Sequence, residues 1–394
     1  MPTQRFKRWG GLGICVAAAS TIAMACGSSA ASASGTHAHA VSTNSKASAH
    51  VSAVTADKAA VAAAEGAWTK WEGPTTPAPA PEHIKLALVV CAGTVAGCTD
   101  PADEAEAAAK SLGWSVTMYD GQGIPSTQGQ MVTQAINSGA NAIIMAGVDP
   151  TAIKSAMALA QSKHIPVGSM TEGIAPGNGV AYDIGANYFD SGELAGQWIV
   201  ASSDGKADVL PTNDKEFKST VALVNGAISE VDACKTCKVL PTQYFVSTDI
   251  GNGLGARIAQ TLQQNPSVNY VIGAFDPAVA DMVPAIQAQG LASKVKIVSD
   301  VGLEQNLTYI KDGDVQAADV VFDNQYVGYA AVDQMIRTLD HKPLAKSSGQ
   351  TNPAYLYNEN VPYHLVTKAN VGNPANPWRA EINTVARFEK LWKR

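Results

Sequence analysis

Basic residues are scarce in this chain, which has 28 Lys and Arg against 34 Asp and Glu. Three of the basic residues, Arg5, Lys7 and Arg8, lie in the first 25 positions, which hold no acidic residue. The remainder therefore has 25 basic and 34 acidic residues, a formal charge of −9. Binding to nucleic acid requires a basic face, so this balance argues against nucleic acid as a partner. It also leaves no polybasic patch for an anionic membrane.

Long hydrophobic runs are lacking as well. The apolar run near the N-terminus, residues 9–25, has 17 residues and is rich in Ala and Gly, whereas a membrane-spanning helix needs about 20 strongly apolar ones. A basic start, a short apolar run and the small residues Ala23-Met24-Ala25 before Cys26 are typical of an export signal. We therefore predict a signal peptide over residues 1–25 and a mature chain that works outside the cytoplasm.

Cysteine is rare, with six in 394 residues, and four of them follow the N-terminal region: Cys91, Cys98, Cys234 and Cys237. An even number in an oxidising compartment implies disulfides, and four cysteines allow three pairings. We predict the local pairs Cys91–Cys98 and Cys234–Cys237, because each closes one loop. A redox role for the Cys-x-x-Cys at 234–237 is the alternative. No His lies near either pair, so we predict no metal site and no cofactor.

Residues 26–82 carry little that could form a compact core. Residues 27–56 are rich in Ser, Ala and Thr without an apolar period, which is typical of a flexible tether. A short helix is predicted over residues 56–71, with Trp68 and Trp71 near its end. The prolines between residues 73 and 81 then predict a stiff spacer.

Strands and helices alternate from residue 84 onward. Short apolar runs that are typical of buried parallel strands occupy 84–90, 114–119, 141–146 and 165–170, with helices predicted over 103–112, 127–138 and 149–163. Repeated strand–helix units of this kind predict a parallel sheet that is covered on both faces.

The alternation resumes after a polar stretch. Strands are predicted over 220–225, 239–246, 268–275, 294–299, 315–322 and 362–366, and helices over 188–203, 255–264, 277–289, 303–311 and 325–339. The tail over residues 373–394 carries Trp378, Phe388 and Trp392, and we predict a helix packed back on the body. The fold class is therefore α/β, with two doubly wound parallel-sheet domains. Ligands bind outside the carboxyl ends of such strands, so two facing edges would form a cleft that can close.

An ordered series of stretches resembles the type I sugar-binding proteins of bacterial ABC importers, the ribose-binding group. Ile165–Met170 resembles their fourth strand, and Asp183–Asn187 with Gly192-x-x-x-Gly196 resembles the crossing into their second domain. Ala274-Phe275-Asp276 and Val298–Gly302 resemble two later ligand loops, and Gln325–Gly328 resembles the start of their penultimate helix. The resemblance covers about residues 84–366.

The resemblance implies the type I periplasmic binding protein fold, with a three-strand hinge that crosses near residues 185, 323 and 364. One lobe would comprise residues 83–185 and 323–345, the other residues 186–322 and 346–372, followed by the tail helix. Three loops depart from the ribose pattern. Thr171-Glu172 stands where the family has an Asp-Arg pair, the 91–98 loop replaces aromatic residues, and Cys234–Cys237 follows Asn225 so closely that the helix between them looks curtailed.

The resemblance also implies a receptor rather than an enzyme, which closes on a small ligand and delivers it to an ABC permease. The position of Cys26 resembles that of the lipid-modified cysteine of bacterial lipoproteins. We therefore expect a monomer that is anchored to the outer face of the cell membrane through lipidated Cys26. A plain secreted protein cut before Cys26 is one alternative, and an extracellular sensor of the same fold is another.

The ends of the predicted strands supply the candidate ligand contacts: Thr94, Asp120, Asp149, Thr171, Glu172, Ser229, Glu230, Asp249, Phe275, Asp276, Asp300 and Asn324. None of these is Arg or Lys, which an anionic ligand usually requires. Carboxylates accept hydrogen bonds from hydroxyls, so we predict a small neutral polyol or sugar-like ligand, with a cationic or nucleoside-like ligand as the alternative. The residues that we expect to contact it are Thr94, Thr171, Glu172, Glu230, Phe275, Asp276 and Asp300. For Asp149, Asp276 and Asn324, helix capping is the competing interpretation.

Overall fold

The structure, a computed structural model, describes residues 54–393. The predicted signal peptide, the predicted lipidation site Cys26 and the first part of the tether lie outside this range. A helix over residues 54–64 opens the described part of the chain and ends well before the predicted bound at residue 71. None of the helices between residues 54 and 393 is long and apolar enough to cross a membrane.

The first sheet has five parallel strands in the order β2-β1-β3-β4-β5. Its strands are β1 (Lys85–Val90), β2 (Ser115–Asp120), β3 (Ala142–Ala146), β4 (Val167–Met170) and β5 (Val180–Ile184), and its helices are α2 (Ala96–Ser111), α3 (Pro125–Asn137) and α4 (Lys154–Ser162). Every residue of β3 and β4 is buried, as expected for strands that helices cover on both faces.

The second sheet has the order β12-β11-β10-β9-β6-β7, with β8 paired to β6. Its strands are β6 (Asp208–Asp214), β7 (Lys238–Val239), β8 (Gln243–Phe245), β9 (Tyr270–Ile272), β10 (Lys296–Val301), β11 (Gln316–Phe322) and β12 (Tyr363–Thr367). Its helices are α5 (Tyr188–Ser202), α6 (Lys218–Ala233), α7 (Leu254–Gln264), α8 (Asp276–Ala288) and α9 (Glu304–Asp312). Short 3₁₀ turns occur at η1 (Ser247–Asp249) and η2 (Pro353–Tyr355). All pairs are parallel except β11 with β12. Together the two sheets confirm the predicted α/β fold class.

The strand predicted over residues 220–225 is wrong, because these residues form part of helix α6. Small residues on α5 and α6 allow the two helices to pack backbone to backbone: a Cβ atom at Gly226 would collide with the carbonyl of Phe189. The apolar side chains among residues 220–225 therefore belong to a helix that packs on α5, and not to a strand. Helix α6 is also not curtailed, since Cys234 directly follows its last residue. The strand in this region is β6, and its Pro211 and its polar end hid it from pattern analysis.

Two further differences have local causes. The strand predicted over residues 239–246 is divided into β7 and β8, with Pro241 between them. Proline has no backbone N–H to donate to a neighbouring strand, so it interrupts the ladder. Strand β5 was not predicted, because its Asp183 breaks the apolar pattern of Val180–Ile184.

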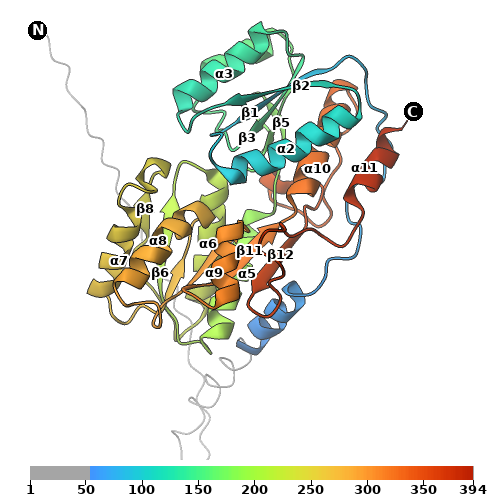
Figure 1. The fold of residues 1–394 in the computed structure, drawn as a ribbon. Coiled ribbons are helices and arrows are strands. Elements are labelled where there is room, and N and C mark those ends of the chain that lie inside the picture. The colour runs from blue at the N-terminus through green and yellow to red at the C-terminus, as the bar shows by residue number, and fades with distance from the viewer. Residues whose placement is uncertain (1–53, 394) are drawn as a thin grey trace, which may run out of the picture. The chain divides into compact units, whose positions relative to one another are not determined.

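The chain passes between the two sheets three times, through residues 185–187, at residue 323 and through residues 340–362. These positions are close to the predicted crossings near 185, 323 and 364. Helix α10 (Asn324–Leu339) follows β11 but packs on α2, β4 and β5 of the first sheet (Figure 1). We call the first sheet with α2, α3, α4 and α10 the N-lobe, and the second sheet with α5 to α9 the C-lobe.

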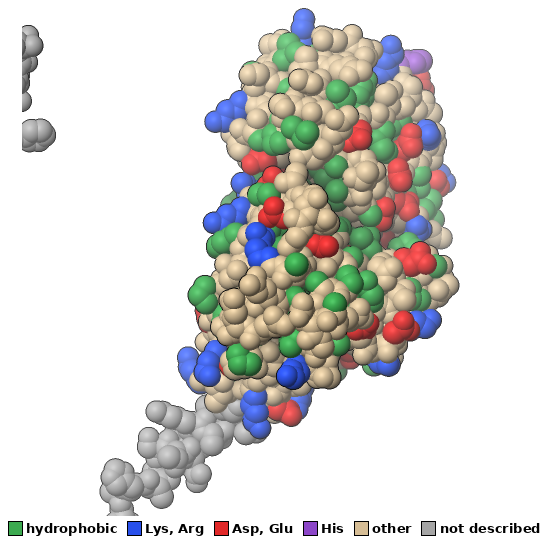
Figure 2. Space-filling model, turned by 60° about the vertical axis from the view of Figure 1, so that its left-hand side comes forward, with side chains coloured by type: hydrophobic (Ala, Val, Ile, Leu, Met, Phe, Trp, Pro, Cys, Tyr) green, Lys and Arg blue, Asp and Glu red, His purple; other side chains and the backbone are tan. Residues whose placement is uncertain are grey.

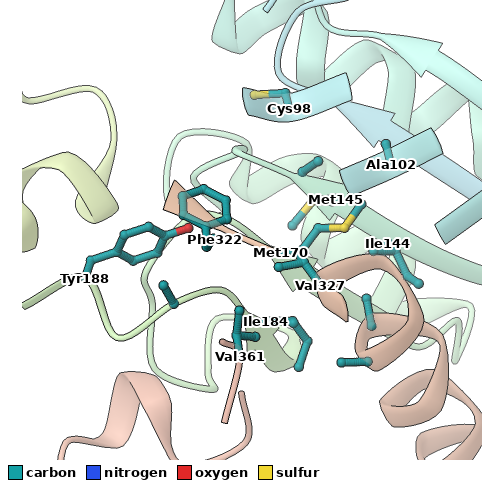
Figure 3. Packing of buried hydrophobic residues seen from close by; sticks show 14 of the residues in the cluster. Cys98, Ala102, Ile144, Met145, Met170, Ile184, Tyr188, Phe322, Val327 and Val361 are labelled. Atoms are coloured by element: carbon teal, nitrogen blue, oxygen red, sulfur yellow. The ribbon is translucent and has the colours of Figure 1, made fainter. Parts of the chain in front are cut away.

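Buried apolar side chains from several elements fill the N-lobe next to the crossings. Met145, Met170 and Ile184 come from three neighbouring strands and pack against Ala102 of α2 and Val327 of α10. Figure 3 shows this cluster, with Tyr188 and Phe322 of the C-lobe at its edge. The core therefore continues up to the border between the lobes, where the site must lie.

Residues 65–82, which we call the N-terminal segment, pack against the C-terminal helix α11 (Thr384–Trp392). The backbone N–H of Ala78 donates to the carbonyl of Leu391 at 2.9 Å. The rings of Trp71 and Phe388 are 5.2 Å apart, and Trp392 stacks on Tyr329 of α10 at 5.7 Å. The predicted helix in the tail is thus present, and it packs on the N-lobe through Phe388 and Trp392, which are both buried (Figure 1).

Surface charges are mixed in sign. Figure 2 shows one face of the molecule, on which acidic, basic and apolar side chains are interspersed rather than gathered in one large area. This distribution agrees with the composition, which offers few basic residues for an extended positive patch.

Candidate functional site

A pocket lies between the two lobes at the carboxyl ends of their strands. It contains about 500 Å³ of space not filled by atoms, including its open mouth, and the centre of a water molecule can reach about 60 Å³ of that space. Its lining residues from the N-lobe are Val95, Gly97, Cys98, Gly147 and Thr171, and those from the C-lobe are Tyr188, Phe217, Ser219, Thr220, Phe275, Pro277, Asp300, Val301 and Phe322. Most of them follow or end a strand, so the pocket occupies the place that two facing parallel sheets predict.

A roomier hollow, in which the centre of a water molecule can reach about 570 Å³, lies between the 54–64 helix and α5. Its lining comes mainly from the 54–64 helix, the segment that follows it and α5, and none of its lining residues has a buried polar atom without a hydrogen-bond partner. We therefore place the candidate site in the smaller pocket between the lobes.

Aromatic side chains form the C-lobe wall of the pocket. The ring of Phe275 lies between Phe217 at 6.0 Å and Phe245 at 5.9 Å, and Tyr188 meets the ring of Phe322 edge to face at 6.0 Å. Phe275 directly precedes α8, at its N-cap position, which fixes its backbone beside the pocket. Such a wall offers flat apolar faces to the C–H side of a sugar ring or to a cation.

Two polar atoms face the pocket from opposite lobes without a partner. Thr171 follows β4 and is 8% exposed, and Asp300 lies in β10 and is 5% exposed. Neither Thr171 Oγ1 nor Asp300 Oδ1 has a hydrogen-bond partner. Burial, with a contribution from the charge of Asp276, raises the pKa of Asp300 well above its ordinary value. A buried polar atom without a partner costs about 1–3 kcal/mol, which a ligand that supplies the partner recovers.

Glu172 lies next to the pocket but does not line it. Its Oε1 atom accepts a hydrogen bond of 3.4 Å from the backbone N–H of Lys218 in the other lobe, and its Oε2 atom has no partner. Burial and the nearby carboxylate of Asp183 raise the pKa of Glu172 well above its usual range. Glu172 therefore sits at the contact between the lobes.

Asp276 lies behind the pocket and holds the loop after β10. Its Oδ2 atom accepts hydrogen bonds from the backbone N–H groups of Gly302 at 2.9 Å and Leu303 at 2.7 Å, and its Oδ1 atom accepts one from Gln316. Burial raises its pKa to about 6, although these hydrogen bonds oppose the shift. Asp276 therefore positions the loop next to Asp300 and does not line the pocket.

Thr94 and Glu230 do not lie on the pocket wall. Thr94 is exposed, and its neighbours Val95 and Gly97 line the pocket instead. Glu230 belongs to α6, where its Cβ atom lies against Gly196 of α5. The expectation that Ser229 and Glu230 follow a strand is wrong, for the same reason that the 220–225 strand is wrong.

The remaining candidates have local partners. Asp120 accepts from the backbone N–H groups of Gly93 and Gln122, and Asp249 pairs with Arg257 at 3.2 Å. Asn324 begins α10, and its Oδ1 atom is buried without a partner. The N-cap of α10 is Asp323, one residue earlier than expected, which accepts from the backbone N–H of Tyr326.

Within the described part of the chain, no Lys or Arg lines the pocket, but one lysine bridges the two lobes beside it. The Nζ atom of Lys218, at the start of α6, lies 3.3 Å from Oδ2 of Asp149, which follows β3 in the opposite lobe. Burial pushes the pKa of Asp149 upward, but hydrogen bonds from Thr151 and the charge of Lys218 outweigh it and leave the pKa below its ordinary value. Lys218 is not among the candidates from the sequence, because the prediction of a strand over residues 220–225 puts the strand end after residue 225, whereas β6 ends before Lys218.

Both predicted disulfides are present, Cys91–Cys98 and Cys234–Cys237. Cys98 lines the pocket. Within residues 54–393, no group of three or more His, Cys, Asp or Glu side chains is arranged to hold a metal ion.

Several lining residues were not singled out from the sequence. Gly147 directly follows a correctly predicted strand, and Phe322 ends another, so a strand-end signal existed for both. Phe217, Ser219 and Thr220 follow β6. Because β6 was not predicted, no strand end pointed to these three residues.

Known proteins share this architecture. The family described as periplasmic binding protein domain matches residues 86–343. The ribose import binding protein of Haemophilus influenzae is 23% identical over 231 residues, which cover 58% of this chain and 77% of that protein.

Solved structures of solute-binding proteins superpose on most of the chain. An ABC transporter solute binding protein from Agrobacterium vitis, bound with α-D-tagatopyranose, has a TM-score of 0.63 at 22% identity and covers 77% of this chain and 98% of its own. The Caulobacter myo-inositol binding protein has a TM-score of 0.63 at 21% identity, with 74% and 96% covered. A glucose-galactose binding protein from Geobacillus stearothermophilus has a TM-score of 0.64 at 21% identity, with 74% and 99% covered. At these identities the likeness shows the fold. Since the family match spans well over half of the residues, this chain belongs to the periplasmic binding protein domain family.

Proposed function

We propose that the protein is an extracytoplasmic receptor that closes on a small neutral polyol or sugar-like ligand and delivers it to an ABC permease. The observation that carries the proposal is the pocket between the lobes, where an aromatic wall faces two unpartnered polar atoms, Thr171 Oγ1 and Asp300 Oδ1. Hydroxyl groups can both donate to a carboxylate and accept from a threonine, so a polyol satisfies both atoms at once.

Closure of the lobes supplies the mechanism. The three crossings would act as a hinge about which the lobes rotate, and the contacts between the lobes lie beside the pocket. Lys218 of the C-lobe reaches Asp149 with its side chain and Glu172 with its backbone N–H, both in the N-lobe. A ligand that contacts both lobes shifts the open–closed equilibrium by its preference for the closed state.

The names of similar proteins support a sugar or polyol as the ligand. They include a ribose import binding protein, a protein bound with α-D-tagatopyranose and a myo-inositol binding protein. The residues that we propose as direct contacts are Thr171, Phe275 and Asp300. We also propose that the protein is a monomer, and that lipidated Cys26 tethers it to the outer face of the membrane.

Carboxyl groups outnumber cations around the pocket, and this favours a second candidate, a sugar that carries an amine. Glu172 Oε2 and Asp300 Oδ1 both lack partners, whereas the Lys218 side chain is already paired with Asp149. An ammonium group could pair with either carboxylate.

The test is titration calorimetry of the mature chain with D-ribose, D-tagatose, D-fucose, D-arabinose, D-galactose, allitol, myo-inositol and D-glucosamine. We expect at least one of them to bind and to raise the melting temperature by mass action. The variant D300A should lose most of that affinity, whereas D312A, which removes an acid at the end of α9 away from the pocket, should retain it. The absence of binding by every compound would refute the ligand class.

A further inference from the structure

We propose that the Cys91–Cys98 disulfide is a positioning element of the ligand site. It holds the first turn of α2 in its binding geometry before the ligand arrives, and it forms part of the N-lobe wall itself. The inference rests on the proposed receptor function. It adds that full ligand affinity requires the disulfide between Cys91 and Cys98.

Cys91 is anchored on the sheet side of the bridge. Its backbone N–H donates to the carbonyl of Ala146 at 2.9 Å, and its own carbonyl accepts from the backbone N–H of Gly123 at 2.8 Å and from Gln128 Nε2 at 3.2 Å. Cys91 is 1% exposed. These contacts tie it to the end of β3 and to the start of α3, so it is a fixed point to which a second residue can be attached.

Cys98 lies at the third position of α2 and is 4% exposed. It lines the pocket together with Val95 and Gly97. The disulfide therefore links the anchored Cys91 directly to the helical turn that lines the pocket.

Gly147 shows how closely the bridge fits the sheet. This residue follows β3, has φ of +62° and lines the pocket. A Cβ atom at Gly147 would lie 2.7 Å from Cys98 Sγ and 3.4 Å from Cys91 Cβ. Only glycine leaves room for the sulfur, so the bridge occupies a defined place over the end of β3.

The turn that the bridge holds has unpaired donors. The N-cap of α2 is Val95, which has no side-chain oxygen to accept from the first N–H groups. Ala96 and Gly97 are the first two residues of α2, so their backbone N–H groups have no acceptor within the helix. Thr171 Oγ1, buried and unpartnered, lines the same pocket. These donors and this hydroxyl would bind oxygen atoms of a polyol.

Little else holds the intervening loop. Gly93 and Thr94 are exposed. The loop is held by hydrogen bonds from Gly93 N–H to Asp120 Oδ1 at 2.7 Å and from Val95 N–H to the carbonyl of Ala92 at 3.2 Å. The Val95 carbonyl in turn accepts from the backbone N–H groups of Cys98 at 2.9 Å and Thr99 at 3.0 Å, the ordinary bonds of a first helical turn. Without the bridge, ligand binding would have to order the loop and the first turn of α2. Ordering at the moment of binding reduces affinity.

The second disulfide provides a matched control. Cys234–Cys237 follows the C-terminal end of α6, and Cys234 Sγ lies 3.8 Å from the carbonyl of Gly205. Neither cysteine lines the pocket. Its removal also deletes one bridge from the C-lobe, but it leaves the loops around the pocket intact.

The experiment compares C91S/C98S with C234S/C237S by calorimetry, using the compound of the panel above that binds the wild-type chain most tightly. We expect C91S/C98S to bind at least about tenfold more weakly, and C234S/C237S to remain within about twofold of wild type. Hydrogen exchange of the ligand-free proteins should show faster exchange over residues 92–98 in C91S/C98S alone. Wild-type protein that is reduced and then reoxidised should regain its affinity.

Two outcomes would overturn the inference: an affinity of C91S/C98S within twofold of wild type, or an equal loss in both double variants. If C91S/C98S does not fold, G147A with both cysteines retained replaces it, because the added methyl group displaces the bridge and should weaken binding to a similar degree. If no compound binds wild type, the proposed function fails, and hydrogen exchange decides the inference by itself: unchanged protection over residues 92–98 refutes it.

Discussion

The ion pair between Lys218 and Asp149 joins the two lobes, so its removal should weaken ligand binding if the lobes close on the ligand. The Nζ and Oδ2 atoms are 3.3 Å apart, and the side chains are 48% and 16% exposed. The variant K218M keeps the backbone N–H that donates to Glu172 and much of the length of the side chain. It therefore removes the charge of Lys218 and little else.

The size of the effect follows from the exposure of the pair. Two unit charges at this separation attract by about 1.3 kcal/mol in bulk water. Because the lysine is half exposed, the net contribution falls in the range of about 0.2–1 kcal/mol that is typical of surface pairs. If the pair forms only in the closed state, its loss raises the Kd of the ligand by a factor of up to about five.

Calorimetry at two salt concentrations tests this reasoning. In 50 mM NaCl, K218M should bind the ligand more weakly than wild type, and in 500 mM NaCl the difference should shrink because salt screens the pair. The control is K215M, which removes the same charge from a lysine of the C-lobe that lies over the ring of Tyr244. A K218M affinity equal to wild type at low salt, or a K215M loss of the same size, would show that the pair does not contribute to closure.

Two further predictions concern stability. The variant F388A should lower the free energy of unfolding by about 3–5 kcal/mol, because Phe388 is fully buried against Trp71 and Tyr326. Urea unfolding measures this loss, and I124A, which truncates a side chain that is 48% exposed, should change it by less than about 0.5 kcal/mol. Burial raises the pKa of Asp183 to about 6 from 3.8, so the folded protein binds its proton more tightly than the unfolded chain does. The stability of wild type relative to D183N should therefore be greatest below pH 4, fall by about 3 kcal/mol as the pH rises to 6, and stay level above it. A difference between the two proteins that is constant with pH would contradict the assigned shift.

The alternation of apolar runs with helical patterns was sufficient to predict two parallel sheets, although strands β5 and β6 were not predicted. Runs such as residues 84–90 and 141–146 are buried on both faces, and burial of this kind requires a nearly continuous apolar sequence. Strand β6 shows the limit of this signal. Its last residues, Thr212, Asn213 and Asp214, are polar but buried. Thr212 donates to the carbonyl of Ile272 and Asp214 accepts from Ser247, and both partners are distant in the chain. A pattern read along the sequence contains no information on those partners.

The candidate site was only partly predictable for a related reason. Thr171, Phe275 and Asp300 end or follow strands that were assigned correctly, and all three line the pocket. Glu230 was misplaced and Lys218 was overlooked, because one wrong element reversed which of its ends faces the cleft. Asp276 follows a correctly assigned strand, yet its carboxylate turns toward the backbone of Gly302 and Leu303. Side-chain direction at such a position depends on nearby donors, which the sequence does not reveal.

The contacts of the N-terminal segment determine where the chain can be shortened for expression. The family match begins at residue 86, which makes a start near that position an obvious choice. Such a fragment would leave the Trp71 face of Phe388 open to water and would remove the carbonyl of Thr76, which accepts a hydrogen bond from the buried Arg337 at 2.8 Å. A recombinant version that begins at residue 54 keeps these contacts. Of the two shortened forms, the one that begins at residue 54 should remain soluble and suitable for crystallisation.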